Sequence, residues 1–423
     1  MTTLYRRLFE PVRIGPRTAK NRIVSSAHAT GYGQDGLLSD RYVEYHARKA
    51  EGGVGINITF GSASVHPNSA ASYGSVSLWD PANEPYLREL ARRTHEHGAL
   101  ILSQATHMGR RGNTLRGGGP LLAPGAVPEP VHREIPHVMS VGEIEEIIQA
   151  FADAARRLEA CGWDGIEVTS YGGHLIEQFW SPVVNRRTDR YGGDFNGRMR
   201  FAEEVVRAVA EAVSDDFIVS FRMTGDPLTE TVGLSREDML EIAQRLDSLG
   251  RIHLFNISGG DGATPLAQSG TIPPVYFPPG CYNHLAHAMK EVVSVPVLVA
   301  GRILTPEQAE AAIANGDCDL AAMTRAIIAD PDLPRKAQAG EAARVRPCIS
   351  INEECIGRVY EGLALRCAVN PAVADHSLRY SHAAAPKRVV VVGGGPAGME
   401  AARVAAERGH RVLLIEGRQE LGG

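Results

Sequence analysis

Three cysteines lie within 20 positions of this 423-residue chain, at Cys348, Cys355 and Cys367. Thiolates are strong ligands for iron and zinc, and cysteines spaced this closely in an intracellular protein indicate a metal site more than disulfides. The chain has only six cysteines, too few for a secreted domain held together by disulfides. We therefore expect a metal centre at these three residues. The other cysteines are expected to be packing residues: Cys161, Cys281 and Cys318.

A glycine-rich loop follows, with Gly393, Gly395 and Gly398 in the spacing GxGxxG. It comes after an apolar strand pattern and opens a helix pattern, and Glu416 ends the next strand pattern. Such glycines allow a tight turn and close approach of a pyrophosphate, and the acid can bind a ribose hydroxyl. One such unit is not a complete nucleotide crevice. We expect residues 386–423 to begin a Rossmann-like FAD/NAD-binding domain, with FAD bound only in a longer chain.

Eight short apolar runs alternate with helical patterns over about 340 residues. These elements must position the chemical groups. This alternation predicts an α/β fold, a (β/α)₈ TIM barrel over residues 1–343, better than an open sheet. A cysteine-bearing linker over residues 344–385 joins it to the incomplete dinucleotide-binding domain. The expected strands are 22–28, 54–60, 99–104, 164–169, 217–223, 252–258, 296–301 and 319–324. The clearest helical patterns are 140–161, 196–213, 235–249 and 305–314.

Polar residues gather at the carboxyl ends of these strands, where barrels carry their chemistry. Arg302 and Arg325 follow the seventh and eighth strands, the usual position for a bound phosphate. With Gly301 and Thr324 beside them, they supply backbone N–H groups and positive charge. The alternative is that both arginines form surface ion pairs. Three further polar residues end strands: His28, Gln104 and Arg222.

Composition limits the possible partners and locations. A net charge of −5 gives no reason to expect a nucleic acid or an anionic membrane as a partner. The first residues contain no apolar stretch typical of a signal peptide, and no run of 18 apolar residues occurs. We expect a cytoplasmic protein that does not span a membrane.

The segment after the fourth strand resembles the signature of the old yellow enzyme family. It reads YGGHLIEQFWSPVVNRRTDRYGG over residues 171–193 and continues as NGRMRF over residues 196–201. With the cysteine segment and the glycine loop, the whole chain resembles the larger branch of this family, which contains 2,4-dienoyl-CoA reductase and trimethylamine dehydrogenase. It is also similar to mycofactocin-associated oxidoreductases. Those relatives are longer, so the resemblance implies a C-terminally truncated chain.

The resemblance implies FMN in the barrel, a four-iron cluster beside it, and FAD or an ADP remnant in the following domain. Gln104 is expected at the pyrimidine edge of the flavin and Arg222 near N1 and C2, where it stabilises the charge of reduced flavin. Ala29 stands where the trimethylamine enzyme has a cysteine bonded to its flavin, so FMN should be non-covalent. The implied FMN residues are Ala27, His28, Ala29, Gly61, Gln104, Arg222, Gly301, Arg302, Thr324 and Arg325.

The region after strand four departs from the alkene-reducing relatives. The two positions that would hold a carbonyl oxygen are Thr169 and Gly172, and His174 replaces the proton-donating tyrosine. Its pattern is closer to that of the N-methyl amine demethylases. His174 is the first candidate proton donor, because imidazole titrates near neutrality, and Tyr171 competes with it. The alternative is that His174 is a buried residue that packs the flavin cavity. The histidine expected after strand six is also absent, with Gly262 near its position.

The cysteine segment departs from the family as well. Relatives have four cysteines, and Ile351 occupies the second position here. Iron–sulfur clusters normally need four thiolates. Three could hold a three-iron cluster, or a four-iron one with Asn352, Glu353 or water on the last iron. Alternatively the cluster has been lost and the thiols pack as small buried residues.

The sequence therefore predicts an FMN-dependent oxidoreductase that transfers hydride between flavin N5 and a small organic substrate. One reaction is reduction of an activated C=C bond with electrons from NAD(P)H. The alternative is oxidation of a methylated amine, with electrons leaving through the cluster to an electron-transfer protein. A homo-oligomer is possible. A flavin-free phosphate-binding barrel lacks support, since no lysine ends a strand; a non-catalytic electron-transfer module stays open.

Overall fold

The structure is a computed structural model that describes residues 4–69, 76–117, 119–130, 133–375 and 381–423. The chain divides into two compact units, Met1–Asn370 and Pro371–Gly423. The first unit contains the barrel and the three-cysteine segment, and the second contains the glycine loop. Each unit is described by itself.

Eight parallel strands of the first unit close into a barrel, in the order β10-β11-β12-β3-β4-β5-β8-β9. All eight fall within or beside the expected runs, which confirms the predicted (β/α)₈ fold. The strands are β3 (Ile23–Ser25), β4 (Ile56–Thr59), β5 (Leu100–Ala105), β8 (Gly165–Thr169), β9 (Ile218–Asp226), β10 (Leu254–Gly259), β11 (Val297–Val299) and β12 (Leu320–Ala322).

Apolar side chains fill the barrel. Val24, Ile56, Leu102 and Leu298 are fully buried in one core cluster contributed by successive strands. A short hairpin, β1 (Val12–Ile14) and β2 (Arg17–Ala19), adds further residues to this cluster. Sequence patterns missed the hairpin, because its strands are only three residues long.

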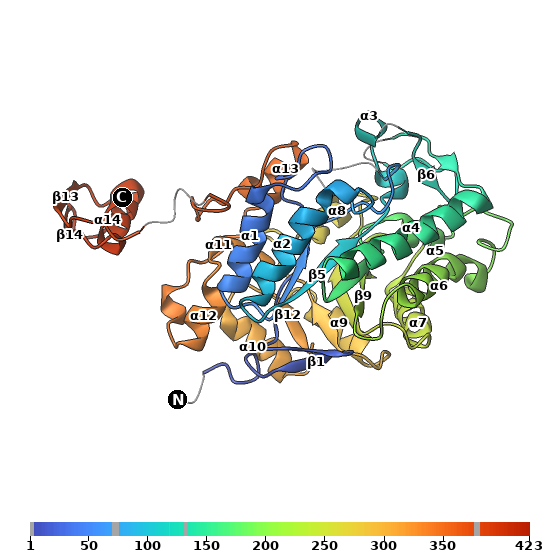
Figure 1. Ribbon diagram of the computed structural model, residues 1–423, viewed down its shortest axis with the longest axis horizontal. Coiled ribbons are helices and arrows are strands. Elements are labelled where there is room, and N and C mark those ends of the chain that lie inside the picture. Colours follow the sequence, from blue (N-terminus) through green and yellow to red (C-terminus); the bar gives the residue numbers. More distant parts are fainter. Residues whose placement is uncertain (1–3, 70–75, 118, 131–132, 376–380) are drawn as a thin grey trace. The chain divides into compact units, whose positions relative to one another are not determined.

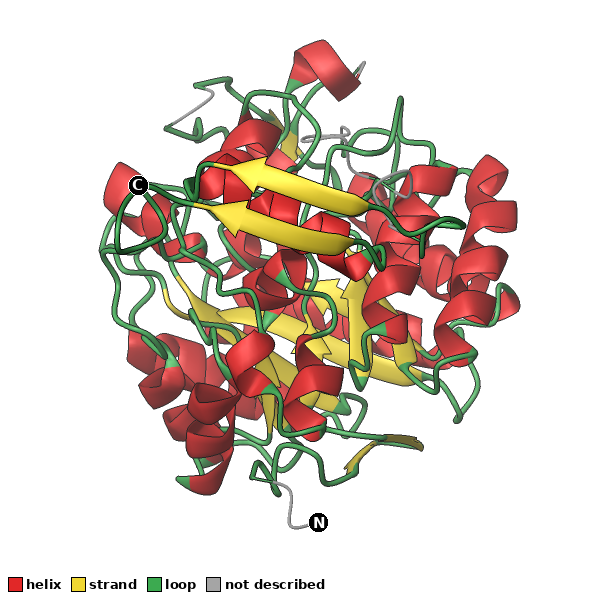
Figure 2. Ribbon diagram, turned by 90° about the vertical axis from the view of Figure 1, so that its left-hand side faces the viewer, coloured by secondary structure: helices red, strands yellow, loops and turns green. Residues whose placement is uncertain are grey.

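Helices surround the strands (Figure 1; Figure 2). Side-chain caps begin three of them: Ser140 and Ser235 form capping boxes with Glu143 and Asp238, and the Thr305 side chain accepts the Gln308 N–H. The longer helices are α1 (Asp40–Glu51), α2 (Glu84–His95), α4 (Val141–Ala160), α6 (Phe195–Glu211), α7 (Arg236–Asp247), α9 (Asn283–Lys290) and α10 (Pro306–Ala314). Shorter ones are α3 (Thr114–Gly117), α5 (Leu175–Trp180), α8 (Pro265–Thr271), α11 (Thr324–Ala329), α12 (Leu333–Gln338) and α13 (Arg358–Tyr360).

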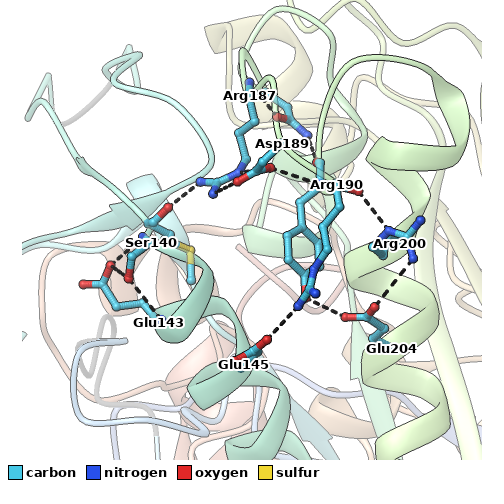
Figure 3. Close-up of polar contacts among 11 residues, drawn as sticks. Ser140, Glu143, Glu145, Arg187, Asp189, Arg190, Arg200 and Glu204 are labelled. Carbon is cyan, nitrogen blue, oxygen red and sulfur yellow. Dashed lines mark hydrogen bonds and ion pairs between the residues drawn. The ribbon is translucent and has the colours of Figure 1, made fainter.

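Most of the family-like signature is structural. Arg187 pairs with Asp189, and Arg190 contacts Glu145 of α4 at 2.6 Å (Figure 3). The buried Asn185 side chain donates to the carbonyls of Phe179 and Tyr191, at 2.7 and 2.8 Å. These contacts tie the segment after β8 to α4 and fix the short helix α5, which carries site residues.

The second unit has the expected strand–loop–helix–strand arrangement. Parallel strands β13 (Arg388–Val392) and β14 (Arg411–Ile415) flank α14 (Pro396–Glu407). A Cβ at Gly398 would overlap the Gly393 carbonyl, so the glycine allows the helix to pack against the loop. The Glu416 carboxylate accepts the Gly394 N–H at 2.6 Å. Nucleotide binding by Gly393, Gly395, Gly398 and Glu416 stays a prediction.

Two smaller expectations concern the cysteines and the membrane. Cys161 and Cys318 are buried and Cys281 is partly buried, and all three are free thiols. Among the described residues, no helix combines the length and apolar character needed to cross a membrane.

Asn185→Ala should destabilise the barrel, because two buried carbonyls lose their donor. We expect a loss of about 2 to 4 kcal/mol in unfolding free energy, measured by chemical denaturation. Arg186→Ala is the control, since that side chain is exposed and should change stability by less than about 0.5 kcal/mol. Equal effects of the two substitutions would contradict the structural role of Asn185.

Candidate active site

A cavity opens at the carboxyl ends of the barrel strands, and every FMN residue expected from the barrel sequence lines it. Side chains from the three-cysteine segment complete the wall. The roles of the expected residues stay predictions, but their convergence in one cavity is a property of the fold. These residues are Ala27, His28, Ala29, Gly61, Gln104, Arg222, Gly301, Arg302, Thr324 and Arg325. The two candidate proton donors, Tyr171 and His174, line the same cavity.

A buried network fixes Gln104 at the end of β5. Its Nε2 donates to Glu167 Oε1 at 2.9 Å, and its Oε1 accepts the Ser62 N–H at 2.7 Å. Asn256 donates to the other Glu167 oxygen at 2.7 Å. Glu167 is completely buried, and burial raises the pKa of its carboxyl group. Sequence patterns missed Glu167 and Asn256, because each lies inside a strand.

Arg222 and Tyr171 form a second fixed pair. The Arg222 guanidinium lies 4.4 Å from the centre of the Tyr171 ring, and its Nη1 donates to Ser26 Oγ at 3.0 Å. The Tyr171 hydroxyl lies 2.5 Å from the Thr271 carbonyl and 3.1 Å from the Gly259 carbonyl. Burial raises the pKa of Tyr171 to about 12. Its single proton is therefore engaged by the backbone.

The two arginines expected at a phosphate have neutral partners only. Arg325 donates to Asn352 Oδ1 at 2.7 Å and to the Pro273 carbonyl at 2.8 Å. Arg302 donates to the Phe277 carbonyl. Within the described part of the chain, neither pairs with a carboxylate, so the surface ion-pair alternative finds no support. Burial lowers the pKa of Arg325, which indicates a cation in need of a counter-charge.

The residues present fit FMN. Arg222 Nε and Arg302 Nε are buried without a partner in the protein, and both residues line the cavity. Such donors suit the acceptor oxygens of a flavin and a phosphate. A Cβ at Gly61 would overlap the backbone of His28 and Ala29, so the cavity wall is built from closely packed main chain.

His28 lines the cavity, but its ring is bound within the protein. Its ring is held by Tyr45 Oη at 2.6 Å and by Lys49 Nζ at 3.1 Å. Lys49 is buried on α1, and burial lowers its pKa well below the ordinary value. Sequence patterns missed this buried lysine, because an isolated lysine in a helix pattern is normally exposed.

His174 is buried at the start of α5, and its Nδ1 lies 2.8 Å from Thr106 Oγ1. Burial, assisted by the charges of Arg111 and Arg222, lowers the pKa of its imidazole to about 3. The role of His174 as a proton donor stays a prediction, and the lowered pKa favours the alternative of a buried ring that packs the cavity. The ring is neutral at physiological pH, so it can donate or accept a hydrogen bond but holds no imidazolium proton.

Arg111 is a cavity residue that the sequence reasoning missed. It follows β5 in a short 3₁₀ turn, Gly109–Arg111, and donates to Gln268 Oε1 at 2.7 Å and to the Gly172 carbonyl. The run of two arginines shortly after the third expected strand was the available signal. Many arginines in the chain lie on the surface, so the run by itself did not separate a cavity residue from a solvated one.

The three cysteines come together in a smaller cavity beside Arg325. Burial raises the pKa of the Cys355 and Cys367 thiols. Ile351, at the second of the four expected cysteine positions, is 42% exposed. No three potential ligands in the described residues are close enough to hold a single metal ion. The segment has three of the four cysteines that a four-iron cluster needs, and metal binding by Cys348, Cys355 and Cys367 stays a prediction.

Comparisons with known proteins agree with this geometry. The model of the NADH:flavin oxidoreductase / NADH oxidase family matches residues 7–343, and that of FAD dependent oxidoreductases matches residues 388–423. N,N-dimethylglycine/sarcosine dehydrogenase of Chromohalobacter salexigens is 44% identical over 98% of this chain and 61% of its own length. NADH oxidase of Thermoanaerobacter brockii is 41% identical over 100% of this chain and 65% of its own length.

A solved structure, 2-naphthoyl-CoA reductase in complex with 2-naphthoyl-CoA, superposes with a TM-score of 0.93 at 34% identity. The match covers 99% of this chain and 66% of that one. The chain thus spans less than two thirds of the length of these relatives. Strands, cavity and family match all agree: the chain belongs to the NADH:flavin oxidoreductase / NADH oxidase family.

Proposed function

We propose that this protein is an FMN-dependent dehydrogenase of N-methylated amines. The observation that carries this proposal is that neither candidate proton donor in the described cavity lining, His174 or Tyr171, is placed to protonate a substrate carbon. His174 has a pKa of about 3, and the Tyr171 hydroxyl is engaged by backbone carbonyls. Amine oxidation needs a neutral amine and no carbon protonation, whereas alkene reduction needs a proton donor.

Bound FMN would supply the oxidant for the methyl C–H bond of the amine: loss of a hydride equivalent from that carbon leaves an iminium ion, which water converts into formaldehyde and the demethylated amine. Gln104 and Arg222 bind the flavin edge that gains negative charge. Glu167 keeps the Gln104 amide in place through its 2.9 Å hydrogen bond. Neutral His174 can accept a hydrogen bond from a substrate N–H without adding positive charge that would repel an ammonium form. An external electron acceptor reoxidises the flavin.

Reduction of an activated alkene with NADH is the second candidate, supported by the likeness to 2-naphthoyl-CoA reductase. In this reaction Tyr171 would be the proton donor. Its ring lines the cavity, but its hydroxyl would have to leave the Thr271 carbonyl, 2.5 Å away. The Thr169 and Gly172 positions also lack the imidazole and amide donors that alkene-reducing relatives place there.

We also propose that Cys348, Cys355 and Cys367 bind a three-iron cluster. Their shared cavity and the isoleucine at the second cysteine position support this ligation. Asn352 is a poor substitute ligand, because its side chain is already bound to Arg325 at 2.7 Å and to the Ile272 carbonyl at 2.7 Å. No step of the proposed reaction depends on the cluster.

The function is tested by anaerobic mixing of the FMN-loaded protein with methylated amines, and separately with NADH followed by cinnamate-type acids or enones. The proposal predicts that methylated amines bleach the flavin absorbance and release formaldehyde. Bleaching by NADH and reoxidation by an alkene, with no response to any amine, would establish the second candidate. A protein that binds no FMN after reconstitution would reject both.

The buried state of His174 makes a separate prediction about pH. Because its pKa is lowered to about 3, the imidazole stays neutral from pH 5 to pH 8. Histidine NMR signals of labelled protein, assigned with His174→Gln, should show no titration of this ring in that interval. A midpoint near 6.5 would contradict its burial and restore it as a general acid.

The cluster proposal predicts the effect of Ile351→Cys. Anaerobically prepared wild-type protein should contain about three iron atoms per chain, and Ile351→Cys about four, because the fourth thiolate completes the ligand set. Iron and sulfide analysis with EPR spectroscopy measures both. Cys281→Ser, outside the segment, is the control and should leave the iron content unchanged. Equal iron content in wild type and Ile351→Cys would contradict three-cysteine ligation.

A further inference from the structure

The charged residues that line the active-site cavity all carry the same sign. Four arginines line it, and no aspartate, glutamate or lysine does so among the described lining residues. Under the proposed function, Arg222 serves the flavin ring, and Arg302 and Arg325 serve the phosphate. Arg111 remains without a role. The buried Glu129 carboxylate beside it balances part of its charge, and its N–H groups are the cavity donors that the flavin account leaves unused.

Arg111 is held in one orientation. Its side chain is 9% exposed, and it donates to the Gly172 carbonyl and, at 2.7 Å, to Gln268 Oε1. Gln268 is itself fixed by a 2.9 Å bond to the Tyr360 hydroxyl. Glu129 lies near the guanidinium Nε, but at 3.7 Å it forms an ion pair without a hydrogen bond. A guanidinium has five N–H groups, so donors remain for a ligand in the cavity.

A glycine, which has no side chain, leaves room for the Arg111 guanidinium. A Cβ at Gly262, after β10, would overlap the Arg111 guanidinium. Gly262 stands near the position where the sequence comparison expected a histidine. The guanidinium thus occupies space that a side chain at residue 262 would fill. A planar guanidinium in a fixed position is the group best suited to bind a carboxylate through two parallel hydrogen bonds.

The cavity is poorly suited to a purely cationic substrate. Quaternary and methylated ammonium ions are usually bound by several aromatic faces. Here Tyr171 and Tyr360 are the phenolic rings of the described lining, and the Tyr171 ring already faces the Arg222 guanidinium. With the other three arginines engaged by FMN, Arg111 would still repel a free alkylammonium ion at its end of the cavity. A negative group on the substrate reverses this repulsion.

We propose that Arg111 determines specificity by binding the carboxylate of the substrate, so that the amines oxidised are N-methyl amino acids. This inference rests on the proposed amine dehydrogenase function and narrows its substrate class. The reacting N-methyl group lies at the flavin end of the cavity, and the carboxylate lies at the Arg111 end. Arg111 binds and orients substrate and takes no proton.

The test compares substrates that differ only in charge. FMN-loaded protein is mixed anaerobically with N,N-dimethylglycine, with its neutral amide, and with dimethylamine. For the wild type, we expect half-saturation of flavin reduction by the carboxylate at a concentration about 10 to 100 times lower than by the amide, the range expected for charge-assisted hydrogen bonds. Arg111→Gln should remove this difference, and Arg111→Lys should restore part of it.

Binding without turnover gives an independent readout. Methoxyacetate has a carboxylate and a methyl group but no amine, and its binding is followed through the flavin absorbance. Arg111→Gln should weaken this binding about 10- to 100-fold while the FMN dissociation constant stays unchanged. Gly262→Ala should have the same effect with the arginine retained, because the added Cβ displaces the guanidinium. Gly142→Ala is the matched control, since its Cβ would meet only Ser140 Oγ at 4.0 Å.

The outcomes separate the two claims. If the amide and the carboxylate reduce the wild-type flavin equally well, the Arg111 proposal is overturned and the amine dehydrogenase function stands. If no amine reduces the flavin but methoxyacetate binds in an Arg111-dependent way, the carboxylate site stands and the dehydrogenase function fails. If Arg111→Gln changes neither the substrate preference nor methoxyacetate binding, the proposal is wrong whatever the reaction.

Discussion

The structure depends above all on an imbalance of charge at one end of the barrel. Arginines from four separate places in the chain converge on a cavity whose described lining contains no carboxylate. Burying such a set costs free energy that hydrogen bonds to carbonyls and amides offset only in part. An anionic cofactor with a phosphate group and an electron-poor ring would supply the negative charge that this lining lacks. Binding of FMN and stabilisation of reduced flavin are, in this view, consequences of the same electrostatic field.

Residues outside the cavity lining hold the polar side chains of the cavity in position. The fully buried Glu167 on β8 binds both Gln104 and Asn256, so one carboxyl group fixes donors on two other strands, β5 and β10. Burial raises the pKa of this carboxyl group, and the charge of Arg222 opposes that rise. The contacts of Asn185 similarly hold the segment that carries His174. These contacts hold the strand-end residues in place although Glu167, Asn256 and Asn185 do not line the cavity themselves.

The fold was largely predictable, and the environment of its side chains was not. Parallel barrel strands are buried on both faces, so each appears as an apolar run that needs no knowledge of its neighbours. Strand-end polar residues such as Gln104 follow from the same pattern. By contrast, the low pKa of His174 arises from burial among residues remote in sequence. The Arg111 guanidinium lies where a side chain at Gly262 would be, although the two residues are far apart in the sequence. Single-residue patterns cannot report such pairs.

The central claim is that the four-arginine cavity is the FMN site, and a crystal structure of the protein reconstituted with FMN tests it most directly. The account predicts density for the isoalloxazine ring against Gln104 and Arg222, density for the phosphate between Arg302 and Arg325, and an Arg111 side chain free of flavin contacts. Flavin density elsewhere in the barrel, or a phosphate away from both strand-end arginines, would contradict it.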